Sequence, residues 1–343
     1  MRGEALKRQV LVLVDREFHM PEDIAKVDNK WLVDWKTEYD VITTLEKLGH
    51  EIRIMGGLSE LGALRECLAE WKPQIVFNLL EEFFGENFYV PYLLGYFELI
   101  RQPFTGCNPA SLLLTSNKPL MKQILAFHRI PMPHFKAFPQ GKKIRPTLEL
   151  TYPLIVKSTT EHGSEGIAQA SIVTSDETLK ERVEFIHNRL RTDAMAEQYI
   201  EGREFYVGVL GNQRLQTLPV WEIRFGNLPE GTKPIATSKI KWDPEYREKL
   251  GIETGAAKDL PPGVEDRLCN ICKRVCRILG FCGYSRMDFR LTPDGKVYLI
   301  EANPNPDLGR HEDYAESAQA TGIPYEDLIE RVLALGLQYQ AGR

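Results

Sequence analysis

Four polar residues near the carboxyl end of the chain have the types and spacing of a cation-binding site. Arg286 and Asp288 alternate along one β-rich run, and Glu301 and Asn303 alternate along the next. The turn Pro293-Asp294-Gly295 between the two runs is typical of a β-hairpin. If Asp294 and Gly295 are the two central turn residues, Asp288 lies opposite Glu301 and Arg286 lies opposite Asn303.

This register predicts a hairpin with two chemically different faces. Because the side chains of a strand alternate, all four polar groups project from one side. The other side is apolar and suits a core; it carries Met287, Phe289, Leu291, Tyr298 and Ile300. A three-residue bulged loop is also compatible with the turn sequence, but it shifts the register by one residue. We favour the even register because it keeps each face chemically uniform.

The polar face has a definite chemical preference. Two carboxylates, a carboxamide and a guanidinium on one surface repel and desolvate each other unless a cation lies between them. Oxygen ligands of this kind suit Mg²⁺ that bridges nucleotide phosphates, with Arg286 paired to an anion nearby. The alternative is a solvated outer face with ordinary cross-strand ion pairs. The pattern favours a metal site formed by Asp288, Glu301 and Asn303.

The first hundred residues alternate between strand-like and helix-like segments. We expect strands at Val10–Val14, Glu51–Met55 and Ile75–Phe77 and helices at Thr37–Leu48, Glu60–Trp71 and Tyr89–Ile100. That order predicts a parallel sheet with helices on its faces, whose ligands bind at the carboxyl ends of the strands. The loops 15–28 and 79–88 should therefore face a site. Both contain acidic residues, including Glu17, Glu81 and Glu82, for which solubilising loop charge is the alternative.

The middle of the chain contains a glycine-rich loop between two predicted strands. The strands are Pro153–Lys157 and Ile167–Val173, and the loop contains Gly163, Ser164 and Gly166. The backbone N–H groups of such a unit can fold over phosphate oxygens because glycine permits close approach. It is not a Walker loop, since no Lys-Ser/Thr pair follows the glycines and no helix begins there.

Further elements flank this loop. Helices are predicted at Lys118–Ile130 and Asp176–Leu190, and strands at Met195–Ile200 and Glu204–Val209. The segment Arg224–Asp243 has many Gly, Pro and Lys residues and no periodicity, which predicts a long functional loop.

Composition and charge restrict the class of protein. A chain of 343 residues exceeds the usual size of one hydrophobic core, so two or three subdomains are expected. The net charge of −5 argues against a nucleic-acid partner. No apolar stretch has the length needed to span a bilayer, and the charged segment Met1–Gln9 lacks the apolar core of a signal peptide. We therefore expect a cytoplasmic protein without a membrane partner, in which cysteines stay reduced.

Three of the six cysteines have a spacing that could suggest a metal or iron–sulfur cluster. Cys269, Cys272 and Cys276 lie within a predicted helix, Asp266–Leu279, at spacings that place them on one apolar stripe. Cysteine behaves there as a small hydrophobic residue, so we predict a core position for the stripe.

The motifs follow one another in a characteristic order. Lys157 ends a strand, and after it come the glycine loop, Glu-Gln-Tyr-Ile-Glu-Gly-Arg-Glu from Glu197, Arg-Met-Asp from Arg286 and Glu-Ala-Asn from Glu301. In this order and spacing the chain resembles the ATP-grasp superfamily, and within it the D-alanine–D-alanine ligase family. The likeness extends from Val10 to Leu335.

The resemblance implies a fold and its ligands. The expected fold class is α/β and α+β, the ATP-grasp fold. An N-terminal parallel-sheet α/β domain at residues 1–115 precedes two β-rich subdomains, 116–200 and 201–343, that clamp ATP. The implied cofactors are ATP and two Mg²⁺ ions, for which Mn²⁺ is a possible replacement.

The resemblance also implies roles for single residues. Lys118 and Lys157 would contact the nucleotide phosphates, Lys241 would be a further lysine on the phosphate side, and Glu204 would bind the ribose hydroxyls. The remaining roles concern the adenine pocket (Glu197, Tyr199 and Ile200), the flexible loop over the phosphates (Gly163, Ser164 and Gly166), the two-magnesium site (Asp288, Glu301 and Asn303) and the reacting carboxylate with its acyl-phosphate (Arg286).

The implied reaction is carboxylate activation. Phosphoryl transfer from ATP to a carboxylate gives an acyl-phosphate, which an amine attacks to give an amide, ADP and phosphate. Acyl-phosphates hydrolyse readily, so loops that exclude water are part of the chemistry. Residues 163–166 and 224–243 are the expected lids.

Three segments that face the substrate in the family have a different sequence here. The His-Gly pair after the third strand is replaced by residues 80–87, the glycine- and serine-rich start by residues 15–19, and the Pro-Gly-Met turn by residues 305–311. We therefore expect a ligase that acts on another amino acid or peptide. Candidate contacts are acids for an amine-bearing substrate (Glu17, Glu81, Glu82 and Asp307) and bases for a carboxylate (Arg310 and His311). The alternatives are a small-molecule phosphotransferase, a true D-alanine–D-alanine ligase and a nucleotide-binding module without catalysis. A homodimer paired through the N-terminal half, as in relatives, is possible.

Overall fold

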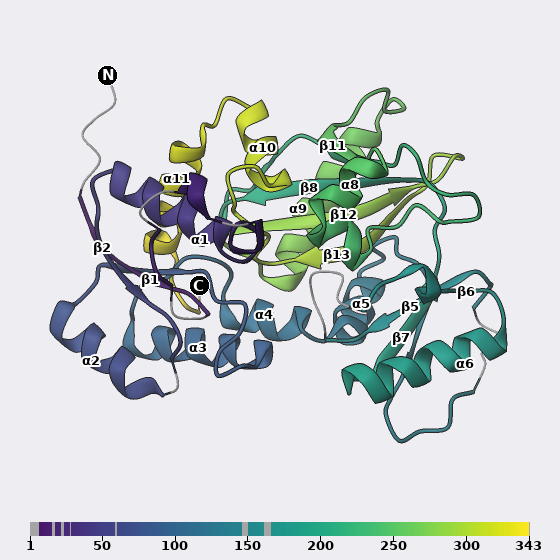
Figure 1. Cartoon of the computed structure of the whole chain (residues 1–343), viewed down its shortest axis with the longest axis horizontal. Helices are drawn as coiled ribbons and strands as arrows, with labels where there is room; N and C mark the ends of the chain where they lie inside the picture. Colours follow the sequence, from purple (N-terminus) through teal and green to yellow (C-terminus); the bar gives the residue numbers. More distant parts are fainter. Residues whose placement is uncertain are drawn as a thin grey trace.

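In the part of the chain that the computed structural model describes, three β-sheets succeed one another along the sequence (Figure 1). It describes residues 7–15, 18–21, 24–27, 29–58, 60–145, 150–160 and 166–342, and of residues 25, 29–33 and 242 the backbone alone. The predicted site residues Glu17, Gly163 and Ser164 lie outside the described residues.

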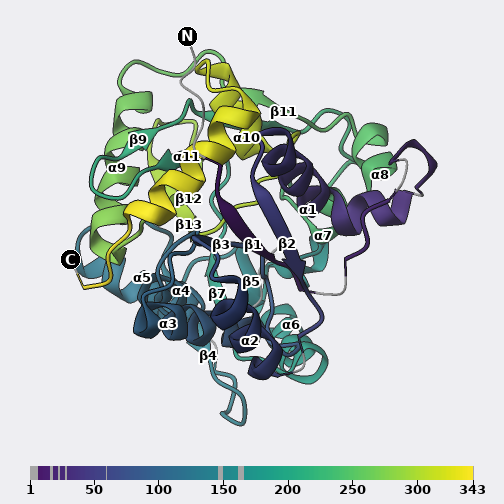
Figure 2. The same cartoon turned by 90° about the vertical axis from the view of Figure 1, so that its left-hand side faces the viewer.

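The first sheet is parallel, as predicted. Its strands are β1 (Gln9–Leu13), β2 (Glu51–Met55) and β3 (Ile75–Asn78), in the order β2-β1-β3. Figure 2 shows these strands beside one another, with helices on both sides. The helices that follow the strands are α1 (Asn29–Lys47), α2 (Leu61–Trp71) and α3 (Val90–Ile100). The first helix begins eight residues before the predicted Thr37.

Alternation along β1 explains why both faces of the sheet are covered. Val10 and Val12 pack in a cluster with residues of α1 and of the C-terminal helix α11 (Tyr325–Gln338). Leu11 and Leu13 pack in another cluster with residues of α2 and α3. The last helix of the chain therefore completes the core of the first sheet. The division at residues 115 and 200 stays a prediction.

The second sheet is antiparallel and has the order β4-β7-β5-β6. Two helices, α4 (Pro109–Thr115) and α5 (Lys118–Phe127), lead into it. Its elements are β4 (Phe135–Phe138), β5 (Leu154–Ser158), β6 (Ile172–Val173), α6 (Asp176–Phe185) and β7 (Ala194–Gln198). The predicted strand Ile167–Val173 is too long, because Gln169–Ser171 forms a 3₁₀ turn and the last two residues alone pair with β5.

The third sheet is antiparallel and carries the predicted hairpin. It has the order β11-β10-β8-β12-β13, with β9 paired to β8. Its strands are β8 (Arg203–Leu210), β9 (Gln216–Thr217), β10 (Trp221–Arg224), β11 (Glu253–Ala256), β12 (Tyr284–Leu291) and β13 (Val297–Asn303). The helices of this part are α7 (Ser238–Trp242), α8 (Pro244–Lys249), α9 (Val264–Leu279) and α10 (Asp313–Ala320).

The cysteine stripe belongs to the core, as predicted. Cys272 and Cys276 are buried on α9 against the apolar face of β12, and Cys269 is partly exposed. All six cysteines are free thiols.

The hairpin has the predicted pairs but not the predicted turn. Arg286 lies opposite Asn303 and Asp288 lies opposite Glu301. Nearer the turn the register differs by one residue, because Thr292 and Lys296 close a three-residue loop. The two-residue turn is therefore wrong. A β-bulge, in which Ile300 has no opposite residue, restores the register before Glu301 is reached.

The bulge also changes which residues of β13 face the core. Met287, Phe289 and Leu291 are buried, as predicted. Tyr298 and Ile300 were predicted beside them, and this is wrong: Val297 and Leu299 occupy the core instead. The one-residue shift turns Ile300 toward the polar side of the hairpin.

Candidate nucleotide and metal site

A cavity lies between the second and third sheets. Its walls come from β5, β7, β8, β12 and β13, together with α5 and α7. Nine residues of the predicted site line it: Lys118, Lys157, Glu197, Tyr199, Ile200, Glu204, Lys241, Asp288 and Glu301. The structure thus brings together side chains that are up to 183 residues apart in sequence, from Lys118 to Glu301.

Asp288 and Arg286 form a partly buried pair on β12. The Nε of Arg286 donates to Oδ1 of Asp288 at 2.8 Å, and its Nη2 donates to Oδ2 at 3.0 Å. The guanidinium also lies 4.7 Å from the ring centre of Tyr206. Burial raises the pKa of Asp288, and the carboxylate of Glu301 adds to this, although Arg286 acts to lower it.

The oxygen donors of this face fit a divalent cation. Glu301 is the cross-strand partner of Asp288, and Lys118 Nζ lies 3.8 Å from its Oε1. Asn303 is the cross-strand partner of Arg286, and its Oδ1 accepts the N–H of Asn305 at 3.1 Å. No group of three or more His, Cys, Asp or Glu side chains in the described ranges is arranged for a metal. The oxygen donors here are two carboxylates and a carboxamide. Phosphate oxygens or water would complete the coordination of a Mg²⁺ ion bound to them.

Glu197 lies between two lysines. Its Oε1 is 2.5 Å from Lys157 Nζ, and its Oε2 is 2.9 Å from Lys122 Nζ. Burial acts to raise the pKa of Glu197, but the two ammonium groups outweigh it and lower the pKa. Burial alone would lower the pKa of Lys157, yet the carboxylates of Glu197 and Glu301 raise it. Both groups are therefore charged, and Lys157 reaches the cavity as a cation.

Glu204 is held by two neighbours in the cavity wall. Its Oε1 accepts from the hydroxyl of Tyr206 at 3.0 Å, and its Oε2 pairs with Nη2 of Arg290. Arg290 also donates to the carbonyl of Pro234 at 2.6 Å and to that of Gly202 at 3.0 Å.

Sequence reasoning missed Arg290 and Lys122. Arg290 stands two residues after Asp288, so period-two alternation could have placed it on the same face. Lys122 stands four residues after Lys118 on α5, which puts both on one side of the helix.

Lys241 lies on a short helix, which corrects the prediction of an aperiodic loop. Helix α7 begins after Thr237, whose Oγ1 accepts the N–H of Ile240 at 3.3 Å. The segment before α7 contacts the chain that follows the glycine loop. Gln169 and Lys233 exchange two hydrogen bonds of 2.9 and 3.0 Å, and the N–H of Ser238 donates to the carbonyl of Ile167 at 3.2 Å. The residues beside the two expected lids therefore touch.

Several acidic side chains gather at the carboxyl ends of β1 and β3. Oδ1 of Asp15 accepts the N–H groups of Glu81 and Glu82 at 2.8 and 3.0 Å. Desolvation and the charges of Asp15 and Asp307 raise the pKa of Glu81 to about 7. The pKa of Glu38 on α1, which sequence reasoning missed, is raised to about 8 by burial and by the same neighbours. The charge of Lys241, which lines the cavity, acts to lower the pKa of Glu81. None of the acids of this cluster is among the residues that line the cavity.

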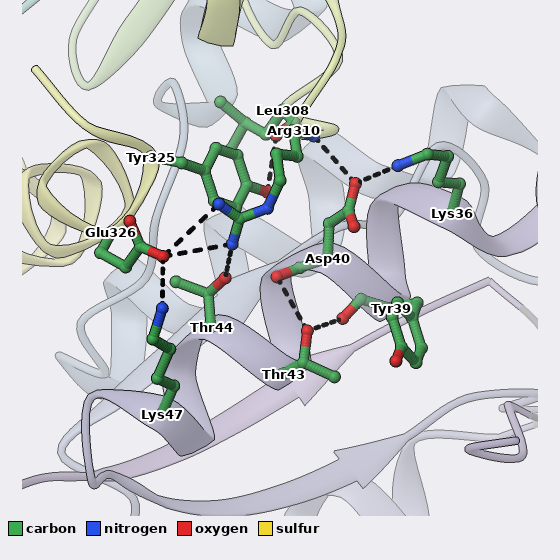
Figure 3. A network of polar contacts seen from close by, with 10 residues as sticks. All are labelled: Lys36, Tyr39, Asp40, Thr43, Thr44, Lys47, Leu308, Arg310, Tyr325 and Glu326. Atoms are coloured by element: carbon green, nitrogen blue, oxygen red, sulfur yellow. Dashed lines mark hydrogen bonds and ion pairs between the residues drawn. The ribbon is translucent and has the colours of Figure 1, made fainter. Parts of the chain in front are cut away.

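Arg310 is not among the residues that line the cavity, and its guanidinium is engaged between α1 and α11, against the prediction that it meets a substrate carboxylate. Figure 3 shows its guanidinium between Thr44 of α1 and Glu326 of α11. The guanidinium lies 4.3 Å from the ring centre of Tyr325, and the backbone N–H of Arg310 donates to Oδ2 of Asp40 at 2.9 Å. The cause is the chain direction after Asn303, which returns to the first sheet. His311 is exposed.

This network predicts an acid-sensitive contribution to stability. The ammonium of Lys47 lowers the pKa of Glu326 to about 2, and Arg310 contributes to this. A lowered pKa in the folded state stabilises the protein above the unfolded pKa, and this is lost as pH falls from about 4.5 towards 2. Glu326→Gln should reduce the free energy of unfolding by about 1–2 kcal/mol at pH 7. Urea unfolding at several pH values should show that difference vanish near pH 2. A difference that is the same at every pH would contradict the assignment, and Glu181→Gln on the exposed side of α6 is the control.

Comparison with known proteins identifies the fold. The fold resembles the crystal structure of D-alanine–D-alanine ligase from Bacillus anthracis complexed with ATP, with a TM-score of 0.74 and 21% identity over 96% of this chain and 98% of that one. The D-alanine–D-alanine ligase from Coxiella burnetii has a TM-score of 0.71, with 18% identity over 97% of this chain and 95% of that one. The three sheets thus form an ATP-grasp fold of the ligase type, as the sequence predicted.

Sequence comparison gives the family. The family model described as D-ala D-ala ligase C-terminus matches residues 124–334. A D-alanine–D-alanine ligase of Syntrophotalea carbinolica is 30% identical over 304 residues, which cover 88% of this chain and 90% of that protein. An uncharacterized protein, y4sG, of Sinorhizobium fredii is 29% identical over 304 residues, or 85% of each chain. The chain belongs to the D-alanine–D-alanine ligase family, which are ATP-grasp ligases of the ADP-forming carbon–nitrogen class. No described helix is long and apolar enough to cross a membrane.

Proposed function

We propose that this protein is an ATP- and Mg²⁺-dependent carboxylate–amine ligase whose substrate is an amino acid or peptide other than D-alanine. One observation carries the proposal: the carboxylates of Asp288 and Glu301 face each other across β12 and β13, at a cavity that also holds Lys118, Lys157 and Lys241. Acids that would bind a cation thus stand beside bases that would bind phosphate.

Different residues of the cavity would contact the adenine, the ribose and the phosphates of ATP. Tyr199 and Ile200 would enclose the adenine, with Glu197 beside its amino group, and Glu204 would accept from the ribose hydroxyls. Lys118, Lys157 and Lys241, which line the cavity, would hold the phosphates. Gly166 is not among the lining residues; in the proposal it ends the loop that would cover the phosphates. Mg²⁺ held by Asp288, Glu301 and Asn303 would neutralise the charge that develops on the transferred phosphoryl group.

Arg286 would have two partners in turn. In the structure its guanidinium donates twice to Asp288, which leaves both groups satisfied. A cation at Asp288 would compete for the same oxygens, so the guanidinium would become available to an anion. The substrate carboxylate is that anion in our proposal. An oxygen of this carboxylate must lie beside the γ-phosphate of ATP for an acyl-phosphate to form. An attacking amine then forms the amide bond, loses a proton and expels phosphate.

The acidic cluster that contains Glu81 and Asp307 suits a substrate with an amine group. Glu81 and Asp307 act electrostatically on each other beside Lys241, and Asp307 is fixed by the hydroxyl of Thr37 at 2.6 Å. We assign the recognition of an amine-bearing substrate to Glu81, Glu82 and Asp307. Arg310 has no part in this proposal because its guanidinium lies in the network with Glu326.

A screen of amino acids and dipeptides for ADP release tests the proposal. Release should need Mg²⁺, a carboxylate and an amine together, and mass spectrometry should detect an amide product. A phosphorylated product that is stable without an amine would instead indicate a phosphotransferase. Efficient formation of D-alanyl-D-alanine would refute the substrate assignment while leaving the ligase reaction intact.

A further inference from the structure

Lys122 is a buried cation that has no place in the roles given so far. Its side chain is 1% exposed, and it does not belong to the residues that line the cavity. A lysine at this depth costs free energy unless its charge is paired and its hydrogen bonds are made. Its neighbours therefore indicate what keeps it there.

The ammonium of Lys122 connects three parts of the fold. It projects from α5, pairs with Glu197 of β7 at 2.9 Å and donates to the carbonyl of Ile300 on β13 at 3.2 Å. It also lies 5.9 Å from the ring centre of Phe135 on β4. One charged group thus joins the linking helix to both sheets that enclose the cavity.

The contact with Glu197 affects the nearby phosphate-binding lysine. Lys157 and Lys122 share this one carboxylate, but of the two only Lys157 reaches the cavity. When Lys157 turns to a phosphate, Lys122 remains as the counter-ion of Glu197. Without Lys122, Glu197 would retain Lys157, because a buried carboxylate cannot lose its last partner cheaply.

The contact with Ile300 affects the metal site. Ile300 is the residue that has no opposite partner in β12, and its bulge brings Glu301 opposite Asp288. The hydrogen bond from Lys122 therefore holds the backbone at the point that sets the register of the two acids. A one-residue slip would turn Glu301 to the other face of the hairpin.

We propose that Lys122 is a positioning residue that frees Lys157 for phosphate and fixes the bulge at Ile300, so that nucleotide binding and metal binding both depend on it. This inference rests on the proposed function, since it assumes that ATP and Mg²⁺ occupy the cavity.

Calorimetric titration of ATP and of Mg²⁺ tests the proposal apart from turnover. Lys122→Met keeps the length of the side chain and removes its charge and its hydrogen bonds. We expect the affinity for ATP without metal to fall about 10- to 100-fold, and the affinity of the ATP complex for Mg²⁺ to fall by a similar factor. Losses of this size are typical when a residue that hydrogen-bonds to and orients the binding groups is removed. Lys122→Arg should recover part of both losses. Lys180→Met, on the exposed side of α6, should bind both as the wild type does.

The effects of the two Lys122 contacts, with Glu197 and with the carbonyl of Ile300, can be measured separately in a variant whose Glu197 charge has been removed. The variant Lys122→Met with Glu197→Gln removes the buried carboxylate together with one of its two ammonium partners, and the ammonium that remains, that of Lys157, reaches the cavity. No buried carboxylate is left without its cation, so this variant keeps the test open if Lys122→Met alone does not fold. Relative to Glu197→Gln alone, it should show little further loss of ATP affinity and a retained loss of Mg²⁺ affinity. Wild-type affinities in Lys122→Met, or no further loss of Mg²⁺ affinity in the double variant, would overturn the proposal. A wild-type protein that binds neither ATP nor Mg²⁺ would instead refute the proposed function.

Discussion

Asp288→Asn should lower turnover by at least about 100-fold, because it removes a charged oxygen donor at the point where the metal would meet the phosphates. The amide retains the size of the carboxylate and can still accept from Arg286, so the fold should persist. Steady-state ADP release and circular dichroism of the same preparation measure the two effects.

The same hairpin offers a matched control. Asp294→Asn makes the identical chemical change in the exposed turn, where Asp294 pairs with Lys296. This variant should keep wild-type turnover. Unchanged turnover in Asp288→Asn would refute the metal assignment, and an equal loss in both variants would point to a damaged hairpin.

Lys157→Met should reduce kcat/KM for ATP by about 100-fold, equivalent to about 2.7 kcal/mol of lost transition-state stabilisation. Of the two lysines that pair with Glu197, Lys157 is the one that reaches the cavity. The raised pKa of Lys157 keeps its ammonium group charged at neutral pH. Its loss leaves Glu197 paired with Lys122, so the protein should remain folded. Initial rates at varied ATP concentration measure the effect.

Lys136→Met controls for the loss of a lysine from the same sheet. Lys136 lies on β4, where its Nζ donates to the carbonyl of Arg145 away from the cavity. Its kcat/KM should match the wild type. If Lys157→Met also retained wild-type kinetics, Lys157 would have no contact with the phosphates.

The pairing of Asp288 with Glu301 was predictable from the sequence, whereas the path of the chain between them was not. Alternation and the turn motif limit the register to a few values, and one of them separates polar from apolar residues. The actual hairpin reaches this pairing through a three-residue turn and a compensating bulge at Ile300. The bulge is supported by Lys122, which is 178 residues away in sequence, so no local pattern could reveal it.

The electrostatic partners of the site were less predictable than its members. Glu197 and Glu204 stand in motifs, but their counter-ions Lys122 and Arg290 depend on how two sheets and a helix come together. Arg310 is a residue that the sequence assigned to the site although its partners lie elsewhere. Its position after the metal hairpin suggested a substrate contact, yet the return of the chain to the first sheet places it on Tyr325.

A crystal structure with a non-hydrolysable ATP analogue and Mn²⁺, which gives an anomalous signal, would examine the metal site itself. Anomalous peaks between the phosphates and the side-chain oxygens of Asp288, Glu301 and Asn303 are the predicted result. Phosphates bound elsewhere, with Asp288 still paired to Arg286 and no metal beside Glu301, would contradict the account.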